Sequence, residues 1–490
     1  MVSKAYIIGT GPGDEELLTL KAVRVLKECT AILYDKLVSG NVLNYLNDDC
    51  EIYYCGKEPG CHYKTQEEIN DMIVELAKKG HIVGRVKGGD PYVFGRGGEE
   101  VLALSENNIE FEVIPGVTSP IAALNYAGIP ITHRGIAQSF HIVTGMTAGV
   151  QKINWNALAN EKGTLVFMMG LSNLDNIVAN LVQNGKEINT PSAIVMKGTG
   201  AKQRKVIGTL ETISSLAKES KIKSPCIIVV GDVVNLSEKL SWYEKKPLFG
   251  KNICVTRSRA QSSNLKVKLK ELGAEVTEIN SIKIEDTKSN LKPYIEKLKD
   301  YEHIVFTSVN AVNMFFDYLV EEKFDIRFLK AKFYCVGRAT DKALVQRGIM
   351  SFVVAKEFIS TNLFDNMKEH IKLEDKVLIP CSNLSNDFLQ TKLEELKANV
   401  DRVNIYNTTK GEVRNQNSFN EVDIVLYTSP STVINMIDML GIEKIKSKKS
   451  IAIGPRTAGT LKEYGIECAV CKKHSEDGFL NEIVEMKDKI

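Results

Sequence analysis

Residues 87–100, which read K-G-G-D-P-Y-V-F-G-R-G-G-E-E, constrain this chain more than any other stretch. An apolar, strand-like run at 81–86 leads into it, and a helix-like segment at 99–107 follows. Glycines allow sharp turns and a close approach of backbone to ligand. Asp90 would then lie at the end of a strand, where open α/β sheets bind ligands. A purely structural loop is the alternative, but loops this rich in glycine and charge more often carry function.

Strand-like and helix-like segments alternate along the first half. Apolar strand-like runs occur at 5–8, 31–34, 82–86 and 111–114. Helical periodicity occurs at 15–27, 65–79 and 119–126. This order predicts an α/β subdomain over residues 1–128 with mostly parallel strands. Further strand-like runs predict a second sheet in residues 129–240; they lie at 139–144, 164–169, 192–197 and 226–230.

A charged segment containing a proline, residues 241–250, separates the two halves. We predict a linker that is partly ordered by packing of Trp242, Tyr243 and Phe249. Beyond it, a strand ending in Thr-Ser is followed by a strand ending in Gly-x-x-Thr, once within 303–340 and again within 423–457. A repeat of this length predicts two similar α/β lobes facing a cleft, and not a solenoid.

Composition excludes several classes of protein. The 490 residues carry a formal net charge of only +2, so a nucleic-acid partner has no global electrostatic support. No apolar run is long enough to span a bilayer, and the start lacks a signal-peptide core, so we expect a cytoplasmic chain with no membrane partner. Its ten cysteines are expected to be reduced. Cys468 and Cys471 form a lone C-x-x-C and the histidines lack metal-ligand spacing, so no metal site is predicted.

The segment 8–14, I-G-T-G-P-G-D, resembles a dinucleotide-binding loop only superficially. Its third glycine comes one residue early, and Pro12 removes an N–H that such loops offer to phosphate. We therefore do not expect NAD here. A tight Gly-Pro-Gly turn can still wrap around a ligand that has no pyrophosphate.

Several motifs together carry a resemblance to a known family. The motifs I-G-T-G-P-G-D, L-Y-D-K-L-V, K-G-G-D-P and I-P-G-V-T-S are similar to those of the tetrapyrrole methyltransferases, which methylate corrin and sirohaem precursors with S-adenosylmethionine. The longer form of residues 87–100, with G-I-P-I-T-H-R at 128–134 and Q-R-K-V-I-G-T-L at 203–210, more narrowly resembles the uroporphyrinogen-III C-methyltransferases, which make precorrin-2. The resemblance covers about residues 1–240 and implies two α/β subdomains with a cleft.

This resemblance implies a set of site residues at matching positions. The S-adenosylmethionine pocket would be formed by Pro12, Gly88, Gly89, Asp90, Val93, Thr118, Ser119, Met169 and Gly198. The proton-handling pair would be Asp35 and Lys57, with Asp35 as the base that deprotonates the alkylated macrocycle. From the residues alone, Asp35 could equally be a helix N-cap and Lys57 a surface lysine. The resemblance further implies a homodimer, with the second sheet as its natural contact surface.

The implied substrate carries eight carboxylates, which arginine binds best. Candidate cations come from separate loops: Lys36, Lys57, Arg85, Arg96, His133, Arg134 and Arg204. Arg96 is favoured because glycines flank and expose it, whereas the others could be ordinary surface charges. One departure is Met146, which stands where the family usually has the histidine of T-G-H. We expect it to affect substrate affinity or the extent of methylation, and not the class of reaction.

Residues 250–490 resemble the uroporphyrinogen-III synthases. The motifs are V-T-R at 255–257, F-T-S-V-N-A-V at 306–312, V-G-R-A-T at 336–340, T-S-P-S-T-V at 428–433 and I-G-P-R-T-A at 453–458. The likeness implies a bilobal α/β domain over 251–490, with one lobe at about 251–283 plus 412–490 and the other at about 286–404. It implies loss of water from hydroxymethylbilane and ring closure with inversion of the fourth ring, mainly by folding a flexible chain.

In this second half the resemblance implies that Tyr406 assists departure of hydroxide. Substrate carboxylates would be bound by Arg257, Ser308, Thr340, Thr428, Ser429 and Thr457. Two alternatives stay open from the residues alone. The ring of Tyr406 could lie in the core of a strand, and the serines and threonines could cap the helices that follow each strand.

Taken together, the two resemblances imply a fused enzyme for consecutive steps toward sirohaem or cobalamin, acting on acidic tetrapyrroles. One alternative is another cobalt-precorrin methyltransferase fused to an inactive synthase-like lobe, against which the F-G-R-G-G-E-E extension argues. Another is a non-catalytic tetrapyrrole carrier, which the presence of Asp35, Lys57 and the whole pocket set disfavours.

Overall fold

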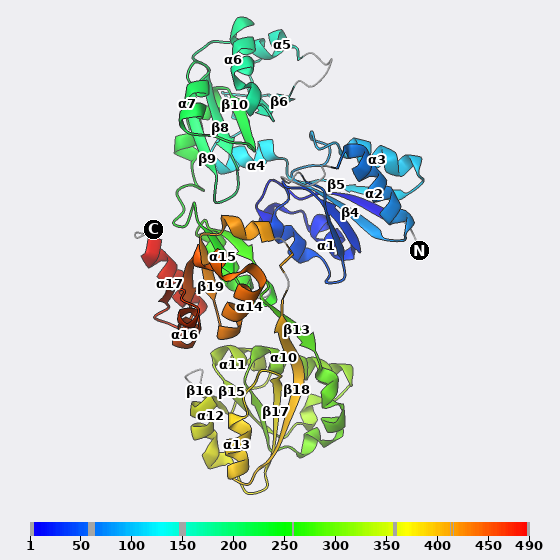
Figure 1. Cartoon of the computed structure of the whole chain (residues 1–490), viewed down its shortest axis with the longest axis vertical. Helices are drawn as coiled ribbons and strands as arrows, with labels where there is room; N and C mark the ends of the chain where they lie inside the picture. The colour runs from blue at the N-terminus through cyan, green and yellow to red at the C-terminus, as the bar shows by residue number, and fades with distance from the viewer. Residues whose placement is uncertain are drawn as a thin grey trace. The chain divides into compact units, whose positions relative to one another are not determined.

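The computed structural model describes residues 4–56, 64–146, 153–256, 259–355, 360–411, 413–414 and 416–487. Their strands form four sheets flanked by helices, so the chain has the predicted α/β fold (Figure 1). The chain divides into two compact units, one of residues 1–280 with 413–490 and the other of residues 281–412. Within the described ranges, no helix is both long and apolar enough to cross a membrane.

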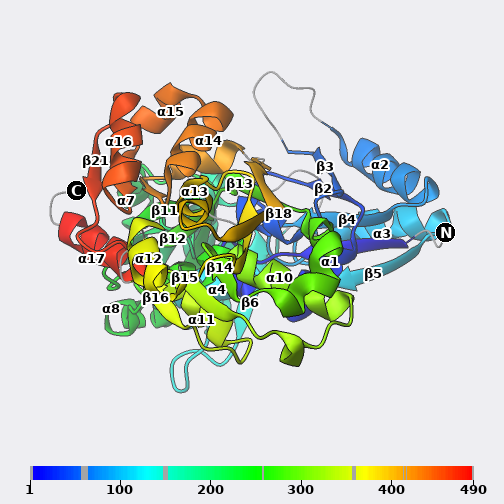
Figure 2. The same cartoon turned by 90° about the horizontal axis from the view of Figure 1, so that it is seen from below.

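The first sheet is entirely parallel, in the order β3-β2-β4-β1-β5. Its strands are β1 (Lys4–Gly9), β2 (Ala31–Tyr34), β3 (Glu51–Tyr54), β4 (Ile82–Lys87) and β5 (Glu110–Ile114). One face packs against α1 (Leu20–Glu28) and η2 (Gly40–Tyr45), and the other against α2 (Gln66–Lys78) and α3 (Gly97–Glu106). Figure 2 shows α2 and α3 beside the strands of this sheet. Because the strands are parallel, the segments leaving their carboxyl ends share one edge.

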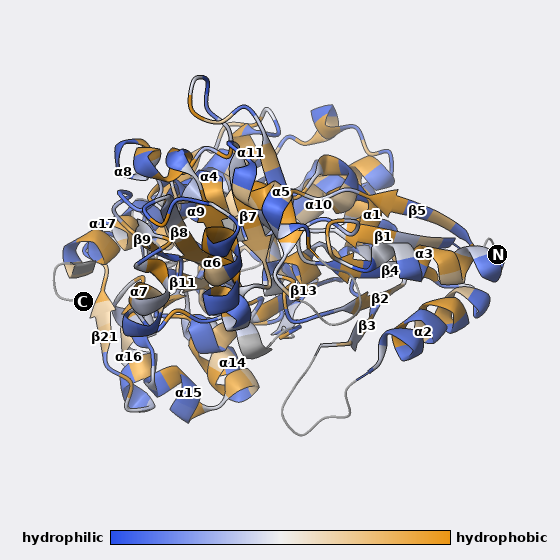
Figure 3. Cartoon of the chain, turned by 90° about the horizontal axis from the view of Figure 1, so that it is seen from above, coloured by the Kyte–Doolittle hydropathy of each residue, from blue (hydrophilic) through white to orange (hydrophobic). Residues whose placement is uncertain are grey.

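Two details of this sheet differ from the sequence prediction. Edge strand β3 was not predicted; it has only four residues, which are at most partly buried at the edge of the sheet. The single helix expected at 15–27 is two elements, η1 (Glu15–Leu17) and α1, because Thr19 caps α1 by accepting a hydrogen bond from Ala22 N. Helix α2 alternates hydrophilic and hydrophobic residues, as expected for one buried face and one solvent face (Figure 3).

The second sheet is mixed, in the order β6-β7-β10-β8-β9, and only β6 and β7 pair in parallel. Its strands are β6 (Phe140–Thr144), β7 (Thr164–Met168), β8 (Pro191–Met196), β9 (Arg204–Thr209) and β10 (Cys226–Val230). One face is covered by α5 (Trp155–Asn160), α6 (Leu174–Gln183) and α7 (Ile213–Glu219). The other packs against α4 (Ser119–Tyr126) and η4 (Asp232–Leu236), so α4 joins the two sheets.

The linker after α8 (Ser237–Leu240) is ordered by aromatic packing, as predicted. The ring of Tyr243 lies 5.6 Å from that of Trp242 and 5.3 Å from that of Phe249. Both Trp242 and Tyr243 also pack edge-on against Tyr126 of α4. Residues 241–250, predicted to be a linker, are therefore fixed to α4 by their aromatic side chains.

The third sheet is parallel, in the order β12-β11-β19-β20-β21. Its strands are β11 (Asn252–Val255), β12 (Glu275–Glu278), β19 (Ile424–Tyr427), β20 (Lys449–Ala452) and β21 (Cys468–Val470). One face packs against α9 (Arg259–Glu271) and α17 (Glu476–Lys487). The other packs against α14 (Pro430–Leu440), α15 (Ile442–Lys446) and α16 (Pro455–Glu463). This sheet thus combines segments that precede and follow the second unit.

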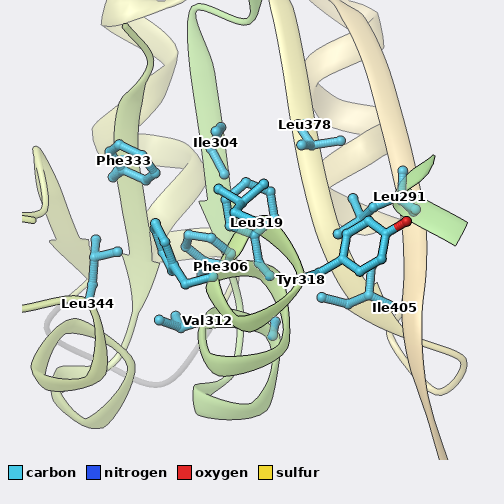
Figure 4. Packing of buried hydrophobic residues seen from close by; sticks show 14 of the residues in the cluster. Leu291, Ile304, Phe306, Val312, Tyr318, Leu319, Phe333, Leu344, Leu378 and Ile405 are labelled. Carbon is cyan, nitrogen blue, oxygen red and sulfur yellow. The ribbon is translucent and has the colours of Figure 1, made fainter. Parts of the chain in front are cut away.

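The second unit contains the fourth sheet, in the order β13-β18-β17-β14-β15-β16. Its strands are β13 (Ile282–Asp286), β14 (His303–Phe306), β15 (Lys332–Val336), β16 (Val353–Ala355), β17 (Lys376–Ser382) and β18 (Asn399–Lys410). Only β13 pairs antiparallel. One face packs against η5 (Lys288–Asp300), α10 (Val309–Glu321) and α11 (Arg338–Val345), with Phe306, Leu319 and Phe333 at its centre (Figure 4). The other packs against α12 (Ser360–Met367) and α13 (Phe388–Glu395).

Candidate active sites

Backbone atoms of three glycine motifs meet at the carboxyl edge of the first sheet. Gly11 N donates to Gly89 O at 3.2 Å, and Gly89 N donates to Gly11 O at 2.7 Å. Gly116 is so close that a Cβ atom there would lie 2.3 Å from Gly89 O, and Gly89 itself has φ +71°. A side chain at Gly116 would therefore clash with the neighbouring backbone, and one at Gly89 would strain its left-handed conformation. The motifs after β1, β4 and β5 therefore build one edge from main chain.

Asp90 ties two of these motifs together. Its Oδ1 accepts a hydrogen bond from Tyr92 N at 2.9 Å, and its Oδ2 accepts one from Gly116 N at 3.1 Å. The half-buried Val93 continues the same turn. Thr118 occupies the N-cap position of α4 without a side-chain capping bond, and Ser119 is the first residue of that helix. Thr118 and Ser119 thus follow Gly116 directly, at the start of α4.

The loop after β8 reaches the loop after β1. Thr199 Oγ1 accepts a hydrogen bond from Asp14 N at 3.2 Å. Gly198 lies against α4, where an added Cβ would be 2.3 Å from Ala123 Cβ. The structure therefore brings Gly198 and the half-buried Pro12 into adjoining loops from different sheets. Met169 follows β7, has a φ of 55° and is 44% exposed. It does not belong to either of these two loops.

Beneath this edge lies a buried ionic cluster. Arg85 Nε and Lys87 Nζ each lie 2.9 Å from Glu100 Oε1, and the three residues are 3%, 5% and 0% exposed. Gln66 Nε2 also donates to Glu100 Oε1, at 3.3 Å. Burial disfavours the charged guanidinium of Arg85, but Glu100 and Asp35 hold its pKa above the usual value. Burial and the adjacent Arg85 lower the pKa of Lys87, which Glu100 only partly offsets.

Asp35 is joined to this cluster at the end of β2. Its Oδ2 lies 3.3 Å from Arg85 Nη2, and its Oδ1 accepts a hydrogen bond from Leu37 N at 3.0 Å. Its side chain is 28% exposed. Asp35 is not a helix N-cap, because Ser39 holds that position before η2. Lys57, its predicted partner, lies outside the described residues.

Arg85 is therefore wrong as a candidate for binding substrate, because it is buried and paired with carboxylates from within the fold. Arg96 is exposed as predicted, and it pairs with Glu99 at 2.8 and 2.6 Å. Its backbone is left-handed, with φ 59°, at the N-cap position of α3. Arg134 is exposed in a turn closed by His133 N and Ala137 O at 3.0 Å. Met146 is 56% exposed.

In the second unit, Tyr406 and Ser308 are brought together. Their hydroxyl oxygens are 2.8 Å apart, and Ser308 also caps α10 by accepting a hydrogen bond from Ala311 N at 3.1 Å. Tyr406 is 5% exposed, and its ring belongs to the core cluster of this unit. Burial raises the pKa of Tyr406, and hydrogen bonds with Ser308 and Ser382 partly offset the rise. Its hydroxyl is thus a neutral donor or acceptor near pH 7.

The remaining hydroxyl candidates are tied into helix starts. Thr340 lies in the first turn of α11 and is 4% exposed. In the first unit, Ser429 caps α14 in a reciprocal arrangement with Thr432, directly after the half-buried Thr428. Thr457 is 3% exposed in the first turn of α16. The capping role considered from the sequence is therefore present at Ser308 and Ser429. Arg257 lies outside the described residues.

Two protein families match this chain. The pattern of the Tetrapyrrole (Corrin/Porphyrin) Methylases matches residues 4–214, and that of Uroporphyrinogen-III synthase HemD matches residues 263–481. A Porphyrin biosynthesis protein HemD of Ruminiclostridium josui is 39% identical, over 98% of this chain and 97% of its own. A Uroporphyrinogen-III C-methyltransferase of Priestia megaterium is 48% identical, over 48% of this chain and 100% of its own. The chain is a tetrapyrrole methylase fused to a uroporphyrinogen-III synthase domain.

A solved structure also resembles the methylase half. It is a Uroporphyrin-III C-methyl transferase from Thermus thermophilus complexed with S-adenyl homocysteine, and it is 38% identical. The match covers 47% of this chain and 93% of that one, with a TM-score of 0.41.

The residue types at the glycine-rich edge of the methylase half fit S-adenosylmethionine. Residues 9–13, 88–93 and 115–119 contain one carboxylate and no lysine or arginine, which suits a sulfonium cation. The positions where a Cβ would clash show that the main chains of these motifs approach one another closely, and Thr118 and Ser119 add hydroxyls. A ligand with a ribose, an amino acid and a positive sulfur can be held by such groups.

Sequence reasoning missed the buried cluster of the methylase half. Arg85 and Lys87 are two residues apart in a strand, so they point to the same face of the sheet. Two cations on one face of a buried strand require a carboxylate partner, and Glu100 supplies it from α3. The spacing of Arg85 and Lys87 in an apolar strand was therefore the signal that could have predicted this cluster. Nothing in the sequence indicated that Thr199 would contact the loop of Pro12.

Proposed function

We propose that this chain catalyses two consecutive steps of tetrapyrrole biosynthesis. The synthase half closes hydroxymethylbilane to uroporphyrinogen III with inversion of ring D. The methylase half then methylates uroporphyrinogen III twice, giving precorrin-2 on the route to sirohaem or cobalamin. The observation that carries the proposal is that both families match in one chain that is 39% identical to a HemD protein over 98% of its length.

S-adenosylmethionine is the methyl donor in this proposal, and it supplies an electrophilic methyl group on a positive sulfur. The residues that hold it are Pro12, Gly88, Gly89, Asp90, Val93, Thr118, Ser119, Met169 and Gly198. The backbone pairing of Gly11 with Gly89 supports this assignment for the loops after β1 and β4. By fixing the donor against the pyrrole carbon, these loops remove most of the entropic cost of reaction.

Asp35 is the proposed base that accepts the proton of the methylated carbon. Arg85 contacts only one of its carboxylate oxygens, and the side chain keeps 28% of its surface exposed, so a proton can reach it. Arg85 is itself fixed by Glu100, which orients Asp35. Lys57 is proposed as its partner in proton transfer. Arg96 and Arg134 are proposed to bind the propionate and acetate groups, and Arg96 would exchange Glu99 for a substrate carboxylate.

In the synthase half, the pyrrole of the bilane itself stabilises the cation left by departing hydroxide. Tyr406 is proposed to donate its proton to that hydroxide. The proximity of Ser308 and the raised pKa of the phenol support a neutral donor at this position. Carboxylate binding is proposed for Arg257, Ser308, Thr340, Thr428, Ser429 and Thr457. The protein otherwise acts by folding a flexible acidic chain for closure.

We assign the methylase to residues 1–240, the linker to 241–250 and the synthase to 251–490. The methylase subdomains are proposed at about 1–128 and 129–240, and the synthase lobes at about 251–283 plus 412–490 and about 286–404. We further propose a homodimer that forms through the second sheet. All described cysteines are free, which supports a cytoplasmic location.

One coupled assay tests the proposal. The full chain is incubated with hydroxymethylbilane and S-adenosylmethionine, and the products are separated and analysed by mass spectrometry. The expected product is a dimethylated uroporphyrinogen III. If the bilane yields only unmethylated uroporphyrinogen I, both activities are refuted. If added uroporphyrinogen III is methylated while the bilane closes only spontaneously, the synthase assignment fails alone.

A further inference from the structure

Helix α9 of the synthase contacts the loop that follows β1 of the methylase, residues 10–16, here called the β1 loop. Lys270 Nζ lies 2.8 Å from Asp14 Oδ1 and 3.3 Å from Glu15 Oε1. Lys266 Nζ lies 2.5 Å from Glu15 Oε1 and 2.5 Å from Glu278 Oε2. The side chains of Lys266, Lys270 and Glu15 are only 11%, 10% and 2% exposed. These ion pairs are largely buried. Glu15 contacts both lysines, whereas the loss of Lys270 leaves the side chain of Asp14, which is 16% exposed, without its cation.

The same part of the synthase contacts a second methylase loop, residues 197–203 after β8, here called the β8 loop. Glu275 Oε2 accepts a hydrogen bond from Ala201 N at 2.8 Å. Lys202 Nζ lies 3.0 Å from Asp423 Oδ1, and Lys197 Nζ lies 2.5 Å from Glu421 Oε1. Gly198, which is proposed to bind S-adenosylmethionine, belongs to this loop.

The two loops are also bonded to each other and to the linker. Asp14 N donates to Thr199 Oγ1 at 3.2 Å, and Tyr126 OH donates to Asp14 Oδ2 at 2.8 Å. Tyr243 OH of the linker donates to Thr199 O at 3.3 Å. Outside its own loop and η1, Asp14 therefore has partners in α9, in α4 and in the β8 loop. Asp14 thus connects α9 to both loops.

We propose that the synthase lobe formed by the third sheet holds the β1 and β8 loops in the conformation that binds S-adenosylmethionine. Lys270 is the principal positioning residue, with Lys266 and Glu275 in support. This inference rests on the proposed methyltransferase function and on the placement of Pro12 and Gly198 in those loops. The relative from Priestia megaterium matches over its whole length within half of this chain. The support of these loops by the synthase lobe, here called bracing, is therefore an added property of the fused chain.

The test is Lys270→Met in the full chain, with the dissociation constant for S-adenosylhomocysteine measured by calorimetry and methylation measured with uroporphyrinogen III. We expect the dissociation constant and the KM for S-adenosylmethionine to rise about tenfold, as is typical of coupling between two sites. Because only binding of S-adenosylmethionine is weakened, the turnover number should change less than about twofold. Lys270→Arg should restore most of the affinity.

Lys268→Met is the matched control, because Lys268 lies on the same helix and pairs with Asp477 of α17 instead. It should leave both constants unchanged. A second variant, Lys202→Met, covers the case in which Lys270→Met does not fold. The ion pair of Lys202 with Asp423 is partly exposed, so its loss should leave the fold intact. We expect this variant to raise the dissociation constant about threefold. Unchanged affinity in folded Lys270→Met or in Lys202→Met overturns the bracing proposal. Failure of the wild type to bind S-adenosylhomocysteine refutes the methyltransferase function instead.

Discussion

The surroundings of Asp35 and of Tyr406 differ in charge. Asp35 lies beside Arg85, which is locked to the fully buried Glu100 together with Lys87. Tyr406 lies among core side chains, and its hydroxyl contacts that of Ser308. The first site keeps four ionisable groups within a buried network, whereas the second offers neutral hydroxyls.

This difference matches the chemistry proposed for each half. Removal of a proton from a carbon requires an oriented base, and the contact with Arg85 fixes the position of the Asp35 carboxylate. Ring closure of a bilane generates a cation that its own pyrrole stabilises, so the protein needs only a weak proton donor and a shaped surface. The charged network therefore surrounds the residue that we propose as the base, and the neutral hydroxyls surround the proposed proton donor.

The largest effect is expected for Asp35→Asn. Loss of the base should lower the turnover number of methylation about 10²- to 10⁴-fold. Binding of S-adenosylhomocysteine should remain, because the pairing of Gly11 with Gly89 does not involve this side chain. Asp175→Asn, at a carboxylate that is 67% exposed on α6, is the control. Wild-type turnover in Asp35→Asn would show that Asp35 is not the base, and the comparison of a charged site with a neutral one would fail.

Glu100→Ala tests the buried network through stability. Arg85 and Lys87 would both remain buried without their shared carboxylate, so we expect a loss of about 3–5 kcal/mol. The adjacent Glu99→Ala is the control, because its pair with Arg96 is half-exposed and should contribute less than about 1 kcal/mol. Denaturant unfolding followed by tryptophan fluorescence and circular dichroism measures both. Equal effects would show that the network is no more important than a surface ion pair.

Tyr406→Phe tests whether the neutral hydroxyl of Tyr406 takes part in ring closure. Removal of the hydroxyl should slow ring closure about tenfold, which corresponds to about 1.4 kcal/mol in the barrier. Loss of the hydrogen bond with Ser308 should cost about 1 kcal/mol of stability. Tyr301→Phe is matched to it, because Tyr301 is equally buried in the same unit but bonds to Asp401. A similar loss of synthase activity in both variants would argue for a purely structural role of Tyr406.

The smallest effect is a pH dependence that arises from Lys87. Its pKa in the folded protein is lowered, by burial first and by Arg85 next. Between that lowered value and the usual 10.5, the unfolded chain binds a proton that the folded chain lacks, so stability rises with pH in this window. Relative to Lys87→Met, the wild type should thus gain free energy of unfolding as the pH increases toward 10.5. A flat or falling difference contradicts this assignment.

Local patterns predicted the parallel sheets and the glycine-rich loops, because apolar runs and glycine spacing are local signals. Strand β3 was missed since its residues are only partly buried at an edge. The antiparallel strands of the second sheet were not predicted, because pairing direction depends on the path of the chain and not on the composition of each strand.

Partners distant in sequence limited the prediction of the sites. Arg85 was taken for a surface cation, because its carboxylate partner Glu100 comes from the following helix. The hydroxyl that contacts Tyr406 belongs to Ser308, on a different strand connection almost a hundred residues earlier. Asp90 was expected at the end of a strand, and it does follow β4, but its two oxygens also join two loops, which a motif cannot reveal.

The third sheet has a consequence for the order of synthesis. Strand β11 lies between β12, which soon follows it in the chain, and β19, which emerges from the ribosome only after the whole second unit. At ordinary translation rates this delay is on the order of ten seconds. Until then β11 exposes an unpaired edge, a site for wrong pairing and chaperone binding. A nascent chain that stops before β19 should therefore aggregate, although its methylase half is already complete.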